Sequence, residues 1–132
     1  MDPPEAPDRS GNEPPAAFAR LETLKKRADF LACARARKQV TPGFVLQGSM
    51  RIADTPANAP IRIGFTASKK VGNAVVRNRA KRRLRALARE ILPKAGRPGW
   101  DYVLIARKDE TARRNFAQMA QELEKALSRL HP

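Results

Sequence analysis

The residues in this sequence that are best suited to chemistry form one long basic segment. Residues 68–85 read SKKVGNAVVRNRAKRRLR, and the wider range 55–89 holds ten Lys or Arg with no Asp or Glu. Cations packed this densely repel one another unless an anionic partner lies against them. Guanidinium groups match phosphate oxygens well, because their N–H donors form a planar fork. The segment therefore predicts binding to a polyanion, and the net charge of +14 over 132 residues points the same way.

The same residues do not suggest a catalytic centre made of protein. A metal-dependent nuclease needs clustered carboxylates for Mg²⁺, and none lies between Asp54 and Glu90. A histidine-based ribonuclease needs a positioned acid and base, but the only histidine, His131, is next to the C-terminus, where we expect fraying. We expect the single cysteine, Cys33, to pack as a small apolar residue. One cysteine forms no internal disulfide, which favours a reducing, cytoplasmic location.

One amphipathic helix can present most of these cations together. Asn73 can cap a helix that runs to about residue 91, and an apolar stripe for the core is formed by Val76, Ala80, Leu84, Leu87 and Ile91. Packing that stripe on a sheet leaves the basic side chains facing outward. The residues predicted to bind the polyanion are Lys69, Lys70, Asn73, Arg77, Asn78, Arg79, Lys81, Arg82, Arg83 and Arg85. Two alternative roles for this helix fit less well. A helix face that is merely solvated would normally carry charges of both signs. A helix that lies on a membrane surface would need a free apolar face with bulky anchors.

The remaining pattern predicts a mixed α+β domain around this helix. Apolar spacing indicates a short helix over residues 27–34 and a C-terminal helix that starts near Thr111. Residues 43–52 and 61–68 resemble strands separated by a Pro-containing loop, which suggests an antiparallel pair. The run WDYVLIAR, residues 100–107, predicts a buried strand in which Trp100 packs.

The two ends of the chain differ in composition. Residues 1–20 hold four acidic and two basic residues and are rich in proline, so we expect a disordered acidic tail. Residues 21–132 are expected to form a single RNA-binding domain. No run of 18 apolar residues occurs, so no transmembrane helix and no membrane partner are predicted.

The stretch IGFTASKKVGNAVVRNRAKRRLR resembles the protein subunit of bacterial ribonuclease P. The pattern KK-x-GNAV-x-RNR-x-KR, residues 69–82 here, is that family's signature. Two flanking pieces, LKKRADF and DYVLIARK, agree in order with the family's first helix and last strand. The resemblance covers roughly residues 21–130. It implies a two-layer α-β-β-β-α-β-α sandwich with a four-stranded mixed sheet, one further short strand near residues 38–42, and a left-handed crossover that carries the basic helix. Most parallel crossovers are right-handed.

The resemblance also implies a function. Such proteins bind a large catalytic RNA, and together they remove the 5′ leader of precursor tRNA by hydrolysis with Mg²⁺. The RNA would carry the chemistry and hold most of the metal, so no catalytic or metal-binding residue is expected in the protein, a monomer in a 1:1 complex. The basic helix would contact the catalytic RNA. A cleft between the first helix and the sheet would bind the single-stranded leader, through Phe30, Ala34, Phe44 and Gln47.

Charge alone leaves other functions open. A ribosomal-type or general RNA-binding module without an enzyme role fits the composition equally well. The RNR pattern favours the ribonuclease P subunit over that module. The missing carboxylate cluster argues against a protein-only nuclease. DNA binding is disfavoured because no recognition helix with a paired support helix is apparent.

Overall fold

The computed structural model describes residues 20–51 and 58–131. Residues 1–19, in which we predicted a disordered tail, lie outside that range. Five strands form one mixed sheet in the order β1-β4-β5-β3-β2. Their bounds are β1 (Leu21–Thr23), β2 (Arg37–Val40), β3 (Phe44–Met50), β4 (Ile61–Thr66) and β5 (Trp100–Ala106). The α+β fold class is confirmed, and so is the short strand expected near residues 38–42.

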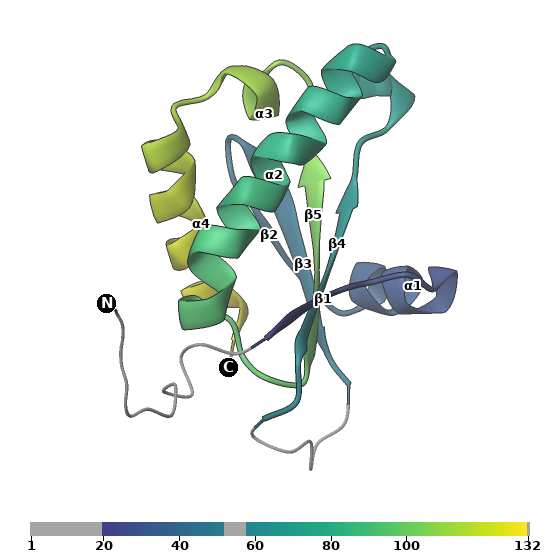
Figure 1. Ribbon diagram of the computed structural model, residues 1–132, viewed down its shortest axis with the longest axis vertical. Coiled ribbons are helices and arrows are strands. Elements are labelled where there is room, and N and C mark those ends of the chain that lie inside the picture. Colours follow the sequence, from purple (N-terminus) through teal and green to yellow (C-terminus); the bar gives the residue numbers. More distant parts are fainter. Residues whose placement is uncertain (1–19, 52–57, 132) are drawn as a thin grey trace, which may run out of the picture.

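The helices lie on both faces of this sheet (Figure 1). They are α1 (Arg27–Arg35), a short 3₁₀ turn η2 (Lys69–Val71), α2 (Ala74–Ala95), α3 (Glu110–Arg113) and α4 (Phe116–Leu130). Helices α2 and α4 cover one face and share its large apolar core, whereas α1 covers the other face over a smaller cluster. None of the helices that the structure describes is long and apolar enough to cross a membrane.

The sheet has one strand more than the four expected. Residues 21–23 pair with β4 in parallel as β1. The backbone N–H of Ile61 donates to the carbonyl oxygen of Arg20 over 2.8 Å, and the N–H of Leu24 donates to that of Ile63 over 2.9 Å. The segment LET has no alternating apolar pattern, so no periodicity indicated a strand there. It is a strand because it covers part of the exposed edge of β4.

The predicted antiparallel pairing of β3 with β4 is wrong. β5 lies between them, antiparallel to β3 and parallel to β4. Six of the seven β5 residues are buried, as expected for a central strand covered on both faces. A continuous apolar run competes better for the central position than two half-polar strands do. The Pro-containing connection, residues 52–57, lies outside the described residues.

The crossover from β4 to β5 is left-handed. Figure 1 views the sheet from the α2 side, with β4 and β5 both running upward and β5 to the left of β4. This agrees with the hand implied by the family resemblance and differs from the common hand of parallel crossovers. The arrangement sets α2 across the front of the sheet, with its outer face free.

Two details at the C-terminal end differ from the sequence-based expectation. The single helix predicted from Thr111 is divided into α3 and α4, and the side chain of Asn115 caps α4 by accepting a hydrogen bond from the N–H of Gln118. His131 is not frayed. Its Nε2 lies 2.6 Å from the hydroxyl of Tyr102, and its ring packs edge-on against Trp100.

Candidate nucleic-acid interface

The start of α2 depends on two residues of the GNAV motif. Asn73 caps the helix, because its Oδ1 accepts a hydrogen bond from the N–H of Val76 over 3.0 Å. Gly72 has a φ of 152°, where a side chain would be strained, and a Cβ there would lie 2.9 Å from Val76. The predicted stripe packs inward as expected, with Ala80 and Leu84 fully buried. These features set the rotation of the helix and so the direction of its cations.

Three predicted RNA-contacting side chains meet beside the first turns of α2. Arg77, Asn78 and Lys81 line a hollow of about 190 Å³ together with Ala67 and Ala74. The Nε of Arg77 is buried, and no described residue accepts a hydrogen bond from it. A buried donor without a partner costs free energy, so the Nε of Arg77 is a polar group that the described residues leave unsatisfied.

The other predicted cations lie along the exposed surface of α2 and just before it. Lys69, Lys70, Arg79 and Arg82 are exposed. Arg85 is exposed too and lies over the ring of Phe65, with 5.6 Å from its Cζ to the ring centroid. In the part of the chain that the structure describes, no cation of α2 forms an ion pair with a carboxylate. The outer face of α2 is therefore a positive surface whose charge the described residues do not balance.

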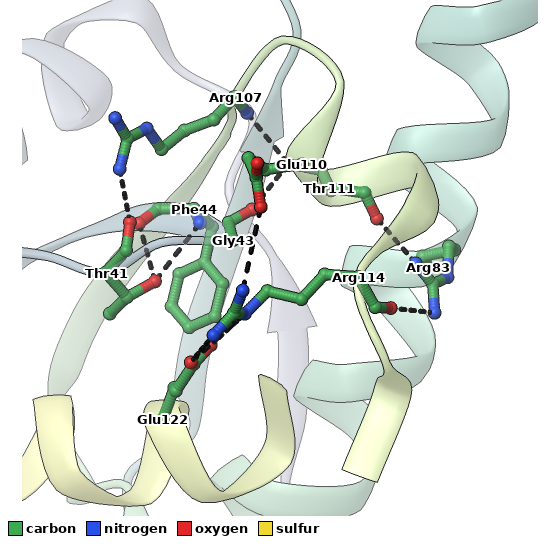
Figure 2. Close-up of polar contacts among 9 residues, drawn as sticks. All are labelled: Thr41, Gly43, Phe44, Arg83, Arg107, Glu110, Thr111, Arg114 and Glu122. Atoms are coloured by element: carbon green, nitrogen blue, oxygen red, sulfur yellow. Dashed lines mark hydrogen bonds and ion pairs between the residues drawn. The ribbon is translucent and has the colours of Figure 1, made fainter. Parts of the chain in front are cut away.

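Arg83 does not belong to this surface, and the prediction that it binds RNA is not supported. Its guanidinium points to the α3 side and donates hydrogen bonds of 2.7 Å to the carbonyl oxygens of Thr111 and Arg114 (Figure 2). Its Cζ also lies 6.0 Å from the centroid of the Phe116 ring. Both acceptors are helix-terminal carbonyls, which a nearby cation satisfies well. The charge run in the sequence gave no sign that one arginine would turn inward.

Figure 2 shows that Arg83 is one part of a polar cluster that joins α2, α3, α4 and the β2–β3 turn. Arg107 donates to the carbonyl of Thr41, and the buried hydroxyl of Thr111 donates to that of Gly43. Arg114 forms an ion pair with Glu122 at 2.6 Å, and this hydrogen-bonded carboxylate raises the pKa of Arg114. The cluster fixes the short helix α3 against α2, so it positions the basic surface without being part of it.

A second candidate surface lies on the opposite face of the sheet, beside α1. The ring of Phe30 lies directly over Gly64, where an added Cβ would be 2.5 Å from the ring. Phe30 also packs against a small cluster with Ile105. Ile105 pairs in register with Val45, and both are half-buried. The apolar floor formed by Val45 and Ile105 was not predicted, although strand alternation in β3 and β5 could have indicated it.

The other predicted cleft residues behave differently from one another. Gln47 is half-buried in β3 and pairs in register with Val103, a residue of the α1-side cluster. Ala34 is exposed, one turn after Phe30 in α1. The prediction that Phe44 lines the cleft is wrong, because Phe44 is 0% exposed in the main core under α2 and α4. Side chains alternate across a strand, so Phe44 and Gln47 point to opposite faces.

An ionic network beneath α1 fixes this face of the sheet. The carboxylate of Asp101, 4% exposed, accepts hydrogen bonds from Arg51 at 2.6 Å and from Arg62 at 2.8 and 2.7 Å. Arg62 also lies 3.4 Å from Asp29 of α1, and the hydrogen bond to Asp101 raises the pKa of Arg62. Asp101 is thus fully engaged by guanidinium groups and is unsuited to a metal ion. No cluster of three or more His, Cys, Asp or Glu able to hold a metal occurs within residues 20–51 and 58–131.

Cys33 is packed in the interior, as predicted. It is 0% exposed, and its thiol lies 3.5 Å from the carbonyl oxygen of Asp101. Burial, with a smaller effect of the Asp101 charge, raises the pKa of the thiol to about 12. The thiolate that a nucleophile requires is therefore not formed near neutral pH.

Comparison with known proteins gives a consistent result. The model of the family described as Ribonuclease P matches residues 18–131. The chain is 52% identical to the ribonuclease P protein component of Ruegeria pomeroyi, over 89% of this chain and 96% of that protein. It is 47% identical to that of Paramagnetospirillum magneticum, with 85% and 84% covered. Among solved structures, the RNase P protein from Thermotoga maritima aligns with a TM-score of 0.64 and 27% identity, over 84% of this chain and 99% of that one.

Proposed function

The chain belongs to the ribonuclease P family, as a protein component of that enzyme, and from this premise we propose that it binds the catalytic RNA and the 5′ leader of precursor tRNA. In this proposal the protein promotes removal of the leader by endonucleolytic hydrolysis in the cytoplasm. It acts as a monomer in a 1:1 complex with the RNA.

The outer face of α2 is proposed to bind the catalytic RNA. The observation that supports this most directly is the absence of internal ion pairs on α2 within the described residues. A helix of 22 residues spans about 33 Å, long enough to follow several successive phosphates. The proposed contacts are Lys69, Lys70, Asn73, Arg77, Asn78, Arg79, Lys81, Arg82 and Arg85. Asn73 would contribute mainly by capping the helix, since its Oδ1 is already engaged.

The face beside α1 is proposed to bind the leader. Single-stranded RNA is held by aromatic stacking and apolar walls together with nearby cations. Phe30 is half-exposed and packs, like Ile105, against the small cluster beside α1, and Ile105 pairs in register with Val45. Gln47 and Ala34 are proposed to extend this surface along β3 and α1. Phe30 supplies the only aromatic ring among the predicted cleft residues that remains accessible, so it is expected to provide most of the stacking.

The chemistry is proposed to occur in the RNA, with Mg²⁺ held mainly by RNA phosphates and waters. Mg²⁺ prefers carboxylate and phosphate oxygens in an octahedral shell. The most buried carboxylate near the proposed leader surface, Asp101, is occupied by Arg51 and Arg62. The protein's own contribution is then to position two RNA segments and neutralise their charge.

Equilibrium competition tests this assignment. A holoenzyme reconstituted from the full chain and a bacterial ribonuclease P RNA is expected to bind leader-bearing tRNA at least about tenfold more tightly than mature tRNA. The RNA alone, assayed at the same ionic strength, is expected to show a smaller preference. If both preferences were equal while the chain still bound the RNA tightly, a general RNA-binding module would be the better description.

A further inference from the structure

A groove at the edge of the sheet connects the two proposed RNA surfaces. β1 covers only the first half of β4, since their pairing ends at Thr23 and Ile63. Beyond this point β4 continues along the open edge of the sheet (Figure 1). A groove of about 280 Å³ lies where β1 ends. Residues 21–24 line it on the β1 side, and the rest of its lining includes Phe30 from α1, Gly64 and Phe65 from β4, and Arg85 and Arg89 from α2.

Among the described residues, the floor of this groove presents one peptide N–H and one C=O without a β1 partner. The N–H of Ile61 donates to, and the C=O of Ile63 accepts from, backbone groups on the β1 side, so the odd-numbered residues of β4 direct their backbone groups toward that edge. Phe65 is the next odd residue; the β1 register ends before it, and none of the described backbone bonds outside the strands and helices involves its N–H or C=O. In an extended strand these two groups of one residue point the same way. Side by side they match the adjacent donor and acceptor on the edge of a nucleobase.

The walls of the groove are suited to the faces of a base. Phe30 lies on one side, against Gly64, which has no side chain to displace it. Arg85 lies on the other side over the ring of Phe65, and bases stack on both aromatic rings and guanidinium planes. Arg89 is exposed at the mouth, whereas the one carboxylate of the lining, Glu22, lies 3.8 Å from Arg20. The mouth can therefore accept a phosphate.

We propose that this groove holds one unstacked nucleotide of the precursor's leader, with its base edge on the Phe65 backbone and its phosphate near Arg89. The inference rests on the proposed leader binding, because Phe30 is a wall of both surfaces and the leader is the single-stranded partner at that face. A peptide strand is a poorer occupant. Within the described residues of β4, only Phe65 lies beyond the β1 pairing with its backbone groups directed to the edge, and strand addition needs several consecutive pairs.

The test measures binding of precursor tRNA to the reconstituted holoenzyme, with a single abasic nucleotide placed at each leader position in turn. Wild-type chain is compared with Arg89→Ala and with Arg129→Ala, which removes the same charge from an exposed site on α4. Alanine favours helix at both sites, so both variants should fold. At one leader position, base removal is expected to weaken binding at least about fivefold with wild-type chain and Arg129→Ala, but less than twofold with Arg89→Ala.

Three other results would contradict the inference. Equal losses at every leader position in all three holoenzymes would mean that the groove holds no leader base, while leader binding itself would stand. An Arg89→Ala holoenzyme that loses the same affinity for mature and for leader-bearing tRNA would assign the groove to the catalytic RNA. No preference for leader-bearing tRNA in any holoenzyme would overturn the proposed leader function, and the groove assignment with it.

Discussion

Arg83 of α2 donates a hydrogen bond of 2.7 Å to the backbone carbonyl oxygen of Thr111 in α3. One cation of the basic segment is thereby committed to the protein's own structure, whereas its neighbour Arg82 remains exposed. The two arginines are adjacent in sequence and have the same chemistry. Substitutions at this pair can therefore distinguish an arginine that stabilises the fold from one that is proposed to bind RNA.

Replacing Arg83 by Met should lower stability with little effect on the salt dependence of RNA binding. The variant removes two charge-assisted hydrogen bonds from a partly buried site, which costs about 1–2 kcal/mol of unfolding free energy. Urea unfolding measures the change, with Arg82→Met as the matched control. An unchanged stability combined with a shallower salt slope would return Arg83 to the RNA interface.

Replacing Arg79 by Ala should reduce the salt dependence of RNA binding with little effect on stability. Arg79 is exposed on the outer face of α2 and has no ion-pair partner among the described residues. Losing one phosphate contact should reduce the slope of log K against log salt by about 1. A titration of catalytic-RNA affinity from low to high salt gives the slope. The same slope as wild type would exclude Arg79 from the interface.

Replacing Phe30 by Ala should reduce selection of the leader. The expected loss is about fivefold or more in the preference for leader-bearing over mature tRNA, because one stacking platform disappears. Leu31→Ala changes an exposed apolar residue next to it on α1 and serves as control. Since Phe30 also packs over Gly64, stability is measured in parallel. Equal weakening for both tRNAs would reduce Phe30 to a packing role.

Replacing Asp101 by Asn should destabilise the fold. Asn cannot balance the charges of Arg51 and Arg62. Arg51 would then be partly buried without a carboxylate partner among the described residues, and Arg62 would keep only its longer contact with Asp29. Breaking such a network costs about 2–4 kcal/mol of unfolding free energy. Asp109→Asn removes one carboxylate at an exposed position with φ of 66°, which Asn tolerates, and should be close to neutral. Comparable losses in both variants would contradict a special role for the network.

Acid should weaken the packing of the C-terminus through His131. The Tyr102 hydroxyl accepts from the N–H of Arg97, and its own O–H can donate to Nε2 of a neutral His131 that carries its proton on Nδ1. Burial, with smaller effects of Arg97 and Arg37, lowers the pKa of His131 to about 4. In the unfolded chain the histidine has a pKa of about 6.5 and binds the proton first, so the contribution of His131 to stability is complete above about pH 6.5 and declines toward pH 4.

The His131→Gln variant isolates this contribution. Its side-chain oxygen can still accept the Tyr102 hydrogen bond, but it does not titrate. Between pH 7 and pH 5, wild type should lose about 1 kcal/mol more stability than the variant, allowing for screening at a partly exposed site. If the melting temperatures of wild type and variant changed by the same amount across that pH range, His131 would not titrate in this way.

The sequence predicted those features that depend on local periodicity. The stripe of α2, its Asn73 cap and the buried β5 follow from helical spacing, capping chemistry and a continuous apolar run. These signals lie within one element, so a single sequence contains them. The left-handed crossover came from the family resemblance, because crossover statistics favour the other hand.

The features that were missed depend on contacts between distant elements. The short strand β1 exists because β4 has a free edge, and β3 fails to pair with β4 because β5 is more apolar. The inward turn of Arg83 depends on helix-terminal carbonyls about 30 residues away. The burial of Phe44 could have been anticipated, since strand alternation puts it on the face opposite Gln47.

We propose that this chain supplies RNA binding to an enzyme whose chemistry lies in RNA. The most direct measurement is cleavage of a precursor tRNA at low Mg²⁺ by the chain alone, by a bacterial ribonuclease P RNA alone, and by both together. We expect cleavage at the leader junction only when both are present. Cleavage by the chain alone would contradict it by revealing a protein active site, and tight RNA binding without stimulation would contradict it by reducing the chain to a general RNA-binding module.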